Sequence, residues 1–221
     1  MKTLARSVVA LLFAATLARA DWVLVQKSVT DGKEKEVTTK IKGEQARVDM
    51  GTQMSVIVGE QGMVMLMHAQ KVMMKMDLAT MKTAMEMAGK ASAVLDKQPA
   101  AKPVATGEKD KVGQWDTEIF TWEGQMGKGR FWVAKDFPKH AEISAISDKL
   151  GQVVGKSMAG LAPQASDFDG MVVKSEVTMM GKKVSSSLVS AKEEDVDPKE
   201  FAPPDGYNEM KMPMLQGAGK P

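Results

Sequence analysis

The chain has 221 residues, and its composition excludes several classes of protein before any motif is considered. It contains no cysteine, so neither disulfide bonds nor cysteine-based zinc sites are available. Residues 1–20 hold three of the 30 basic residues and none of the 28 acidic ones, which leaves 27 basic and 28 acidic side chains in the rest. This near-neutral balance lacks the basic footprint of a nucleic-acid-binding protein, so we expect no nucleic-acid partner.

Residues 1–20, MKTLARSVVALLFAATLARA, have the three parts of a secretory signal peptide. A basic start precedes an apolar run over 8–17, and Ala18 and Ala20 occupy the −3 and −1 positions of a cleavage site before Asp21. The apolar run is shorter than the roughly 20 residues that a membrane-spanning helix needs. We therefore expect cleavage, a periplasmic or secreted protein, and no transmembrane segment afterwards.

The first part of the mature chain alternates apolar and polar residues with a period of two, which is typical of short antiparallel strands. Turn residues such as Asp31-Gly32 separate the segments. The segment 63–67 is apolar on both faces, so it is covered on both sides or contacts a ligand. The expected strands are 22–29, 36–42, 46–50, 54–58, 63–67 and 72–76.

The period changes at Asp77, which is placed to cap a helix. An apolar stripe predicts a first helix over 78–95, and a second stripe after Pro138 predicts a helix over 139–161. The Pro-, Ala- and Lys-rich stretch 96–107 is typical of a solvated linker. Further strands are expected at 108–112, 115–123, 129–135, 171–179 and 182–191, with a two-residue turn at Met180-Gly181.

This order of elements predicts an α+β fold, in which a curved antiparallel sheet, or half-barrel, carries two main helices packed on its concave face. Residues 21–212 are expected to form one domain, followed by a disordered tail over 213–221. The proline-containing closing segment 195–207 places Phe201 and Tyr207 where they would pin the chain end to the sheet.

The motifs of the common enzyme classes are missing. The two histidines, His68 and His140, have no cysteine to pair with, and His68 is expected to be a strand-end histidine with a hydrogen-bonded ring. No serine lies in a G-x-S-x-G setting, and G-Q-M-G-K-G at 124–129 lacks the Lys-Ser/Thr pair of a phosphate loop. We therefore expect that the protein is not an enzyme and that it has neither a catalytic residue nor a cofactor.

Residues 63–87 are dense in methionine, which allows two interpretations. Grouped thioethers beside His68 suit copper(I), whereas unbranched, polarizable side chains also make apolar surfaces that adapt to varied ligands. The methionines follow the local strand or helix period, which favours packing or an apolar ligand over a metal site. Tryptophans on strands are candidates to line the same cavity. The predicted ligand-binding residues are Met65, Met67, Met74, Met76, Met81, Met85, Trp122 and Trp132.

Three stretches, 38–50, 66–76 and 170–207, resemble an uncharacterised family of Met-rich secreted bacterial proteins known only as a domain of unknown function. More distantly, the order of elements resembles the periplasmic lipoprotein-carrier (LolA/LolB-like) fold, a curved sheet that shelters acyl chains. That resemblance implies a lipid, an acyl chain or an envelope protein as partner. Those carriers use an arginine in the cavity, but Arg47 alternates to the face opposite its neighbours, so the role is not transferred.

The leading hypothesis is a periplasmic binding or carrier protein whose Met- and Trp-lined cavity lies between strands 63–76 and the two helices. One alternative is a copper(I)-binding periplasmic protein. Another is a structural or envelope-interaction protein without a small ligand.

Overall fold

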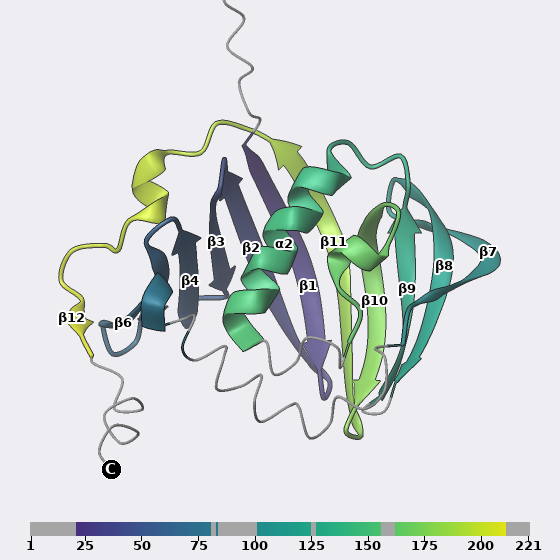
Figure 1. Cartoon of the computed structure of the whole chain (residues 1–221), viewed down its shortest axis with the longest axis horizontal. Coiled ribbons are helices and arrows are strands. Elements are labelled where there is room, and N and C mark those ends of the chain that lie inside the picture. The colour runs from purple at the N-terminus through teal and green to yellow at the C-terminus, as the bar shows by residue number, and fades with distance from the viewer. Residues whose placement is uncertain (1–20, 81–82, 84–100, 125–126, 156–161, 211–221) are drawn as a thin grey trace, which may run out of the picture.

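The structure is a computed structural model that describes residues 21–80, 83, 101–124, 127–155 and 162–210. These residues form one twelve-stranded sheet in the order β12-β6-β5-β4-β3-β2-β1-β11-β10-β9-β8-β7 (Figure 1). The strands are β1 (Trp22–Thr30), β2 (Lys33–Lys42), β3 (Gln45–Met50), β4 (Met54–Gly59), β5 (Gly62–Met67), β6 (Val72–Asp77), β7 (Val104–Val112), β8 (Trp115–Gly124), β9 (Gly127–Ala134), β10 (Met171–Met179), β11 (Lys182–Glu193) and β12 (Asn208–Glu209). The helices are α2 (His140–Gly155) and the 3-10 turns η1 (Ala165–Asp167) and η2 (Pro198–Phe201).

Consecutive strands lie side by side in two groups, β1–β6 and β7–β11, which we call the two meanders. In the second meander, α2 and η1 come between β9 and β10 in the chain. In the β1–β2 turn, Asp31 and Gly32 both have positive φ, 51° and 76°, as a two-residue hairpin turn of the favoured handedness requires. Met180 and Gly181 repeat this geometry between β10 and β11, with φ of 50° and 78°. The hairpin predicted at Met180-Gly181 is therefore confirmed.

The two meanders join at the centre of the sheet, where β1 pairs with both β2 and β11. The chain then returns to the far edge, and β12 pairs with β6 in parallel, with Asn208 opposite Val72 and Glu209 opposite Met73. The remaining strand pairs are antiparallel. The sheet is therefore mixed, and β12 and β7 are its two edges.

Helix α2 lies across the middle of the sheet, over β1 and its neighbours (Figure 1). Ile143 of α2 is fully buried and belongs to a core cluster with Trp22 and Leu24 of β1. Phe137, just before the helix, stacks against Trp22 with ring centroids 6.0 Å apart. The face of the sheet that bears Trp22 and Leu24 is called the helix face below. No helix among the described residues has both the length and the apolar character needed to cross a bilayer.

The predicted half-barrel with two main helices on its concave face is wrong. The described residues form one large open mixed sheet, and α2 is the long helix that lies on it. Because β1 is hydrogen-bonded along both edges, the two meanders join into one continuous sheet. Period-two patterns specify which residues share a face, but they do not specify which distant strand becomes the partner.

Parts of several predicted segments lie outside the described residues. The predicted helix 139–161 corresponds to α2, and its last residues, 156–161, are not described. Of the predicted helix 78–95, residues 78–80 and 83 are helical, and Asp77 caps this start by accepting a hydrogen bond of 2.7 Å from the Thr80 amide. The predicted signal peptide (1–20), residues 96–100 of the predicted linker and the predicted tail (213–221) also lie outside the described residues. Strand β7 begins at Val104, within the predicted linker.

Candidate functional site

The helix face of β1–β6 is built from three rows of cross-strand neighbours, because residues directly opposite each other in an antiparallel pair share a face. Each row begins on β1 beneath α2 and ends on β6 at the far edge of the meander. The rows are Trp22, Ile41, Ala46, Val58, Met63, Met76; Leu24, Thr39, Val48, Val56, Met65, Met74; and Gln26, Val37, Met50, Met54, Met67, Val72.

The β3–β6 part of these rows carries seven methionines, and we call it the Met face: Met50, Met54, Met63, Met65, Met67, Met74 and Met76. Met63 is buried, and the other six are half-buried. Three strand spacings separate β3 from β6, so the face is roughly 15 Å wide. Thioether chains of this kind re-pack around apolar molecules of different shape. The Met face is thus an adaptable apolar surface.

Four predicted ligand-binding residues, Met65, Met67, Met74 and Met76, lie together on the Met face. Met81 and Met85 lie outside the described residues. Trp122 and Trp132 are not part of this face, since they lie on β8 and β9 in the other meander and are buried at 3% and 4% exposure. Trp122 donates to the Ala101 carbonyl at 3.0 Å, and Trp132 donates to Asp110 Oδ2 at 2.9 Å. The structure therefore separates the two tryptophans from the methionines.

A cavity of about 180 Å³ lies between α2 and the sheet. Its walls combine hydroxyls, one amide and the apolar start of β10: Gln26, Ser144, Ser147, Met171, Val173 and Ser186 are among the lining residues. Gln26 also begins the third row, which continues through Val37 to Met50 and Met54 of the Met face. The cavity beneath α2 therefore lies on the same side of the sheet as the Met face, about two strand spacings away from it.

The opposite face of β1–β6 is covered by the C-terminal strap, residues 194–210. Val196 and Phe201 of the strap are buried against Ile57 and Leu66, and Tyr207 packs at the edge of this cluster. Leu66 has no exposed surface. The expected pinning of the chain end by Phe201 and Tyr207 is therefore confirmed, and we call this side the strap face.

A chain of polar contacts lies in the strap face and ends on the strap. Ser55, which is fully buried, donates to Asp49 Oδ1 at 2.5 Å and lies 2.7 Å from His68 Nε2. His68 Nδ1 is 2.5 Å from the Tyr207 hydroxyl. If Ser55 gives its proton to Asp49, His68 Nε2 must donate to Ser55, and Tyr207 then donates to Nδ1 of the neutral ring. The His68 ring is hydrogen-bonded, as the sequence predicted, and both of its nitrogens take part.

Further contacts hold the strap along its length. Arg47 donates to the Glu200 carbonyl at 2.9 Å and to Asp49 at 2.8 Å. Asp21 is buried, binds Lys42, and accepts a hydrogen bond of 3.1 Å from the Val196 amide. Arg47 thus lies on the strap face, opposite the Met face, as the alternation of β3 predicted.

The Ser55, His68 and Asp49 cluster differs from a nucleophilic triad in the order of its contacts. In a triad, histidine lies between the serine and the carboxylate. Here Ser55 lies between Asp49 and His68, and the far nitrogen of the ring faces a tyrosine. Sequence reasoning did not place Ser55 or Asp49 in a network, because their common row with Leu66 depends on strand register. The sequence did carry one signal for this network. Alternation along β3 and β4 puts Asp49 and Ser55 on the face opposite Val48 and Val56.

No group of three or more His, Asp or Glu side chains with metal-binding geometry occurs in the part of the chain that the structure describes. His68 lies on the strap face, so its ring is separated from the thioethers of Met65 and Met67 by the sheet. The arrangement proposed for copper(I), thioethers with a neighbouring histidine, is therefore not formed by these residues.

No curated protein matches this chain, whereas solved structures resemble it in fold. An uncharacterised conserved protein from Thermus thermophilus shares the fold, with a TM-score of 0.51, 8% identity, and coverage of 89% of this chain and 92% of that one. The lipoprotein LppX from Mycobacterium tuberculosis also matches, with a TM-score of 0.37, 9% identity, and coverage of 79% and 88%.

A DUF1329 family protein from Desulfovibrio piger matches with a TM-score of 0.32 and 12% identity, over 85% of this chain and 91% of that chain. The family comparison is more direct, because one family model covers most of the chain. It is described as a domain of unknown function, DUF4412, and it matches residues 23–207. This confirms the resemblance to an uncharacterised family, and the chain belongs to the DUF4412 family.

Proposed function

We propose that this protein is an exported binding or carrier protein that takes an apolar ligand, such as a lipid chain, on the Met face. One observation carries the proposal: strand register gathers seven methionines on one face of β3–β6. A closed core more often uses branched side chains with defined rotamers, whereas methionine is over-represented on apolar surfaces that bind varied partners. The leader predicted at residues 1–20 supports export.

The contrast between neighbouring residues supports binding over simple packing. Leu66 and Ile57 on the strap face are branched and almost without exposed surface, and Met65 and Met67 beside them on the helix face are half-buried. The cavity beneath α2 adds space on the same face. At about 180 Å³ it is smaller than a typical ligand pocket of roughly 300–1,000 Å³, so the ligand must use the Met face as well.

A fluorescent fatty-acid probe tests the proposal. We expect the wild type to bind it and Met74→Lys to abolish binding, because a buried ammonium beside an acyl chain is strongly disfavoured. Met180→Lys is the matched control, since it makes the same chemical change in a turn where Met180 is 79% exposed, and it should bind normally. A wild type that neither binds the probe nor carries lipid in native mass spectra after purification from its own cells would overturn the proposal.

Copper(I) competition titrations separate the metal alternative. We expect negligible copper(I) affinity in the wild type and in His68→Ala. Tight stoichiometric binding that is lost in Met65→Leu with Met67→Leu would replace the lipid proposal with a metal site. Methionine to leucine nearly conserves volume, so such a loss would reflect the missing sulfur atoms and not unfolding.

A further inference from the structure

A groove lies on the β7–β11 meander, away from the Met face. It has a volume of about 650 Å³ and crosses all five strands from β7 to β11. Four basic residues line it, Lys102, Lys128, Arg130 and Lys183, against two acidic ones, Glu123 and Glu176. We call it the cationic groove.

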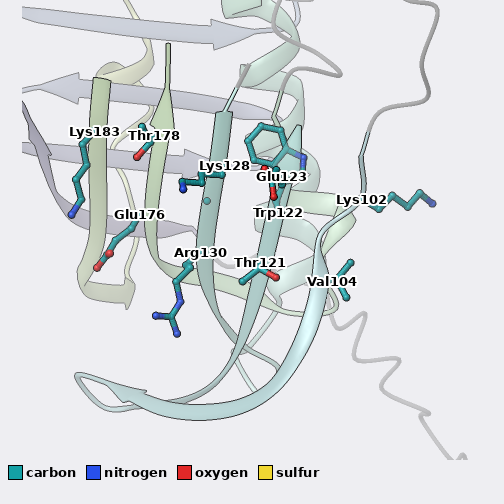
Figure 2. A pocket seen from close by; sticks show the side chains of 11 residues that line it. Lys102, Val104, Thr121, Trp122, Glu123, Lys128, Arg130, Glu176, Thr178 and Lys183 are labelled. Atoms are coloured by element: carbon teal, nitrogen blue, oxygen red, sulfur yellow. The ribbon is translucent and has the colours of Figure 1, made fainter. Parts of the chain in front are cut away.

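Strand register explains why the charges gather there. Arg130 on β9 is opposite Glu176 on β10, and Lys128 is opposite Thr178, which in turn is opposite Lys183 on β11. Figure 2 shows Lys128, Arg130 and Lys183 on these strands with Glu176 beside them, whereas Lys102 extends away. Three cations thus come from three adjacent strands.

Two of these three cations form no ion pair with the described residues of the protein. Lys128 and Lys183 have no ion-pair partner within 4.0 Å among the described residues, whereas Lys27, Lys40 and Lys75 elsewhere on the sheet each contact a glutamate. Arg130 uses one terminal nitrogen, Nη2, to contact Glu108 at 2.9 Å. Its remaining guanidinium donors are available to a ligand.

Of the two acids that line the groove, Glu123 on β8 is opposite Lys128 on β9, and Glu176 has a partner of its own. Glu176 accepts from Lys174 Nζ at 2.9 Å, and that ammonium also lies 3.9 Å from the centre of the Trp132 ring. The Lys174 hydrogen bond, with the charges of Lys183 and Arg130, holds the pKa of Glu176 below its usual range. Glu176 is therefore ionised at neutral pH, and Lys174 offsets its charge, so it cannot neutralise Lys128, Arg130 and Lys183 together.

We propose that the cationic groove binds a phosphate-bearing ligand through Lys128, Arg130 and Lys183. Arginine presents several donors in a planar fork that suits phosphate oxygens, and each lysine adds a point charge. The Thr121 and Thr178 side chains in the same lining supply hydroxyls for additional hydrogen bonds. This site is separate from the Met face, so an experiment that disproves binding at one site does not disprove binding at the other.

Titration of residues 21–221 with inorganic phosphate, followed through backbone amide chemical shifts of β9 and β10, tests the groove. The double variant Lys128→Gln/Lys183→Gln should bind phosphate about tenfold more weakly, because two charge-assisted contacts are lost. Glu176→Gln should bind it more tightly, since a repelling carboxylate is removed. Lys199→Gln, on an exposed lysine of η2, should leave affinity unchanged. Because the two groove substitutions act in opposite directions, general unfolding cannot imitate the result.

Vesicle flotation identifies the source of the phosphate. Binding to phosphatidylglycerol vesicles but not to phosphatidylcholine vesicles, lost in the double variant, assigns the groove to anionic lipid headgroups. Phosphate binding without vesicle binding assigns it to a soluble phosphate ester. The proposal is overturned if the wild type binds neither phosphate nor phosphatidylglycerol, if the double variant binds as the wild type does, or if Glu176→Gln fails to strengthen binding.

Discussion

The two faces of the β1–β6 meander are built from the same six strands and differ in the side chains that predominate on them. The helix face ends in seven half-buried or buried methionines, and the strap face carries branched residues such as Ile57 and Leu66 under the C-terminal strap. The strap face also contains directed polar contacts from Ser55 to Tyr207. A sheet of alternating side chains can thus place an adaptable surface and a specified core back to back.

This difference has a structural cause. Hydrogen bonds and branched side chains fix one geometry on the strap face, so the backbone of β3–β6 is held from one side. Met side chains on the other side are then able to change rotamer without loss of the strand register. We infer that the strap stabilises the sheet and leaves the Met face free to vary. Four substitutions or conditions test this comparison.

The largest effect is expected from Leu66→Ala on the strap face. Leu66 has no exposed surface, so truncation leaves a cavity beneath Phe201 and should lower the free energy of unfolding by about 2–5 kcal/mol. Urea unfolding followed by tryptophan fluorescence measures the change. Met65→Ala, on the adjacent residue of the other face, should cost less because Met65 is half-buried. Equal losses at the two positions would contradict the proposed difference between the faces.

Removal of the buried hydroxyl should have the next largest effect. Ser55→Ala leaves a nitrogen of His68 without its partner and removes one of the donors to Asp49, which keeps its contact with Arg47. The free energy of unfolding should therefore fall by about 1–3 kcal/mol. Hydrogen exchange should also speed up at the Asn208 and Met210 amides, which bond to the carbonyls of Lys71 and Met73. A stable variant with unchanged exchange in the strap would show that the polar chain does not hold it.

Met65→Leu should change stability only slightly. The substitution conserves volume and removes one flexible thioether, so we expect a loss below about 1.5 kcal/mol. Binding should respond more than stability, because a branched side chain narrows the range of ligands that the surface accepts. The affinities of fatty-acid probes with different chain lengths measure this range. An unchanged range, or a loss of stability as large as that of Leu66→Ala, would argue for a closed core.

The smallest effect is a pH dependence that originates outside both faces. The hydrogen bond from Lys174 lowers the pKa of Glu176 below its ordinary value of 4.5. The contribution of this pair to stability is therefore complete above about pH 4.5 and is lost as the pH falls through the lower folded-state pKa. The free energies of unfolding of the wild type and Glu176→Gln should differ by a few tenths of a kcal/mol at about pH 6, and by less at about pH 3. A difference that grows on acidification would have the wrong sign.

Much of the architecture could be predicted from local pattern. Alternation identified the strands of both meanders, because side chains on a strand point to opposite faces in turn. The turn at Met180-Gly181, the cap at Asp77 and the helix after Pro138 depend on neighbouring residues alone, and the structure contains all three. The face assignments of Met65, Met67, Met74, Met76 and Arg47 follow from the same alternation.

The chain's local patterns determined the strands of the two meanders, several turns, the placement of methionines on one face and the pinning of the C-terminal segment by Phe201 and Tyr207. Only the tertiary structure decided that β1 joins β11, that β12 runs parallel to β6, and that Trp122 and Trp132 lie away from the methionines. It also decided that Ser55 meets His68 and that Lys128 and Lys183 converge with Arg130. These contacts depend on register between strands that are distant in sequence, and register is set by the packing of the whole sheet, not by any single strand.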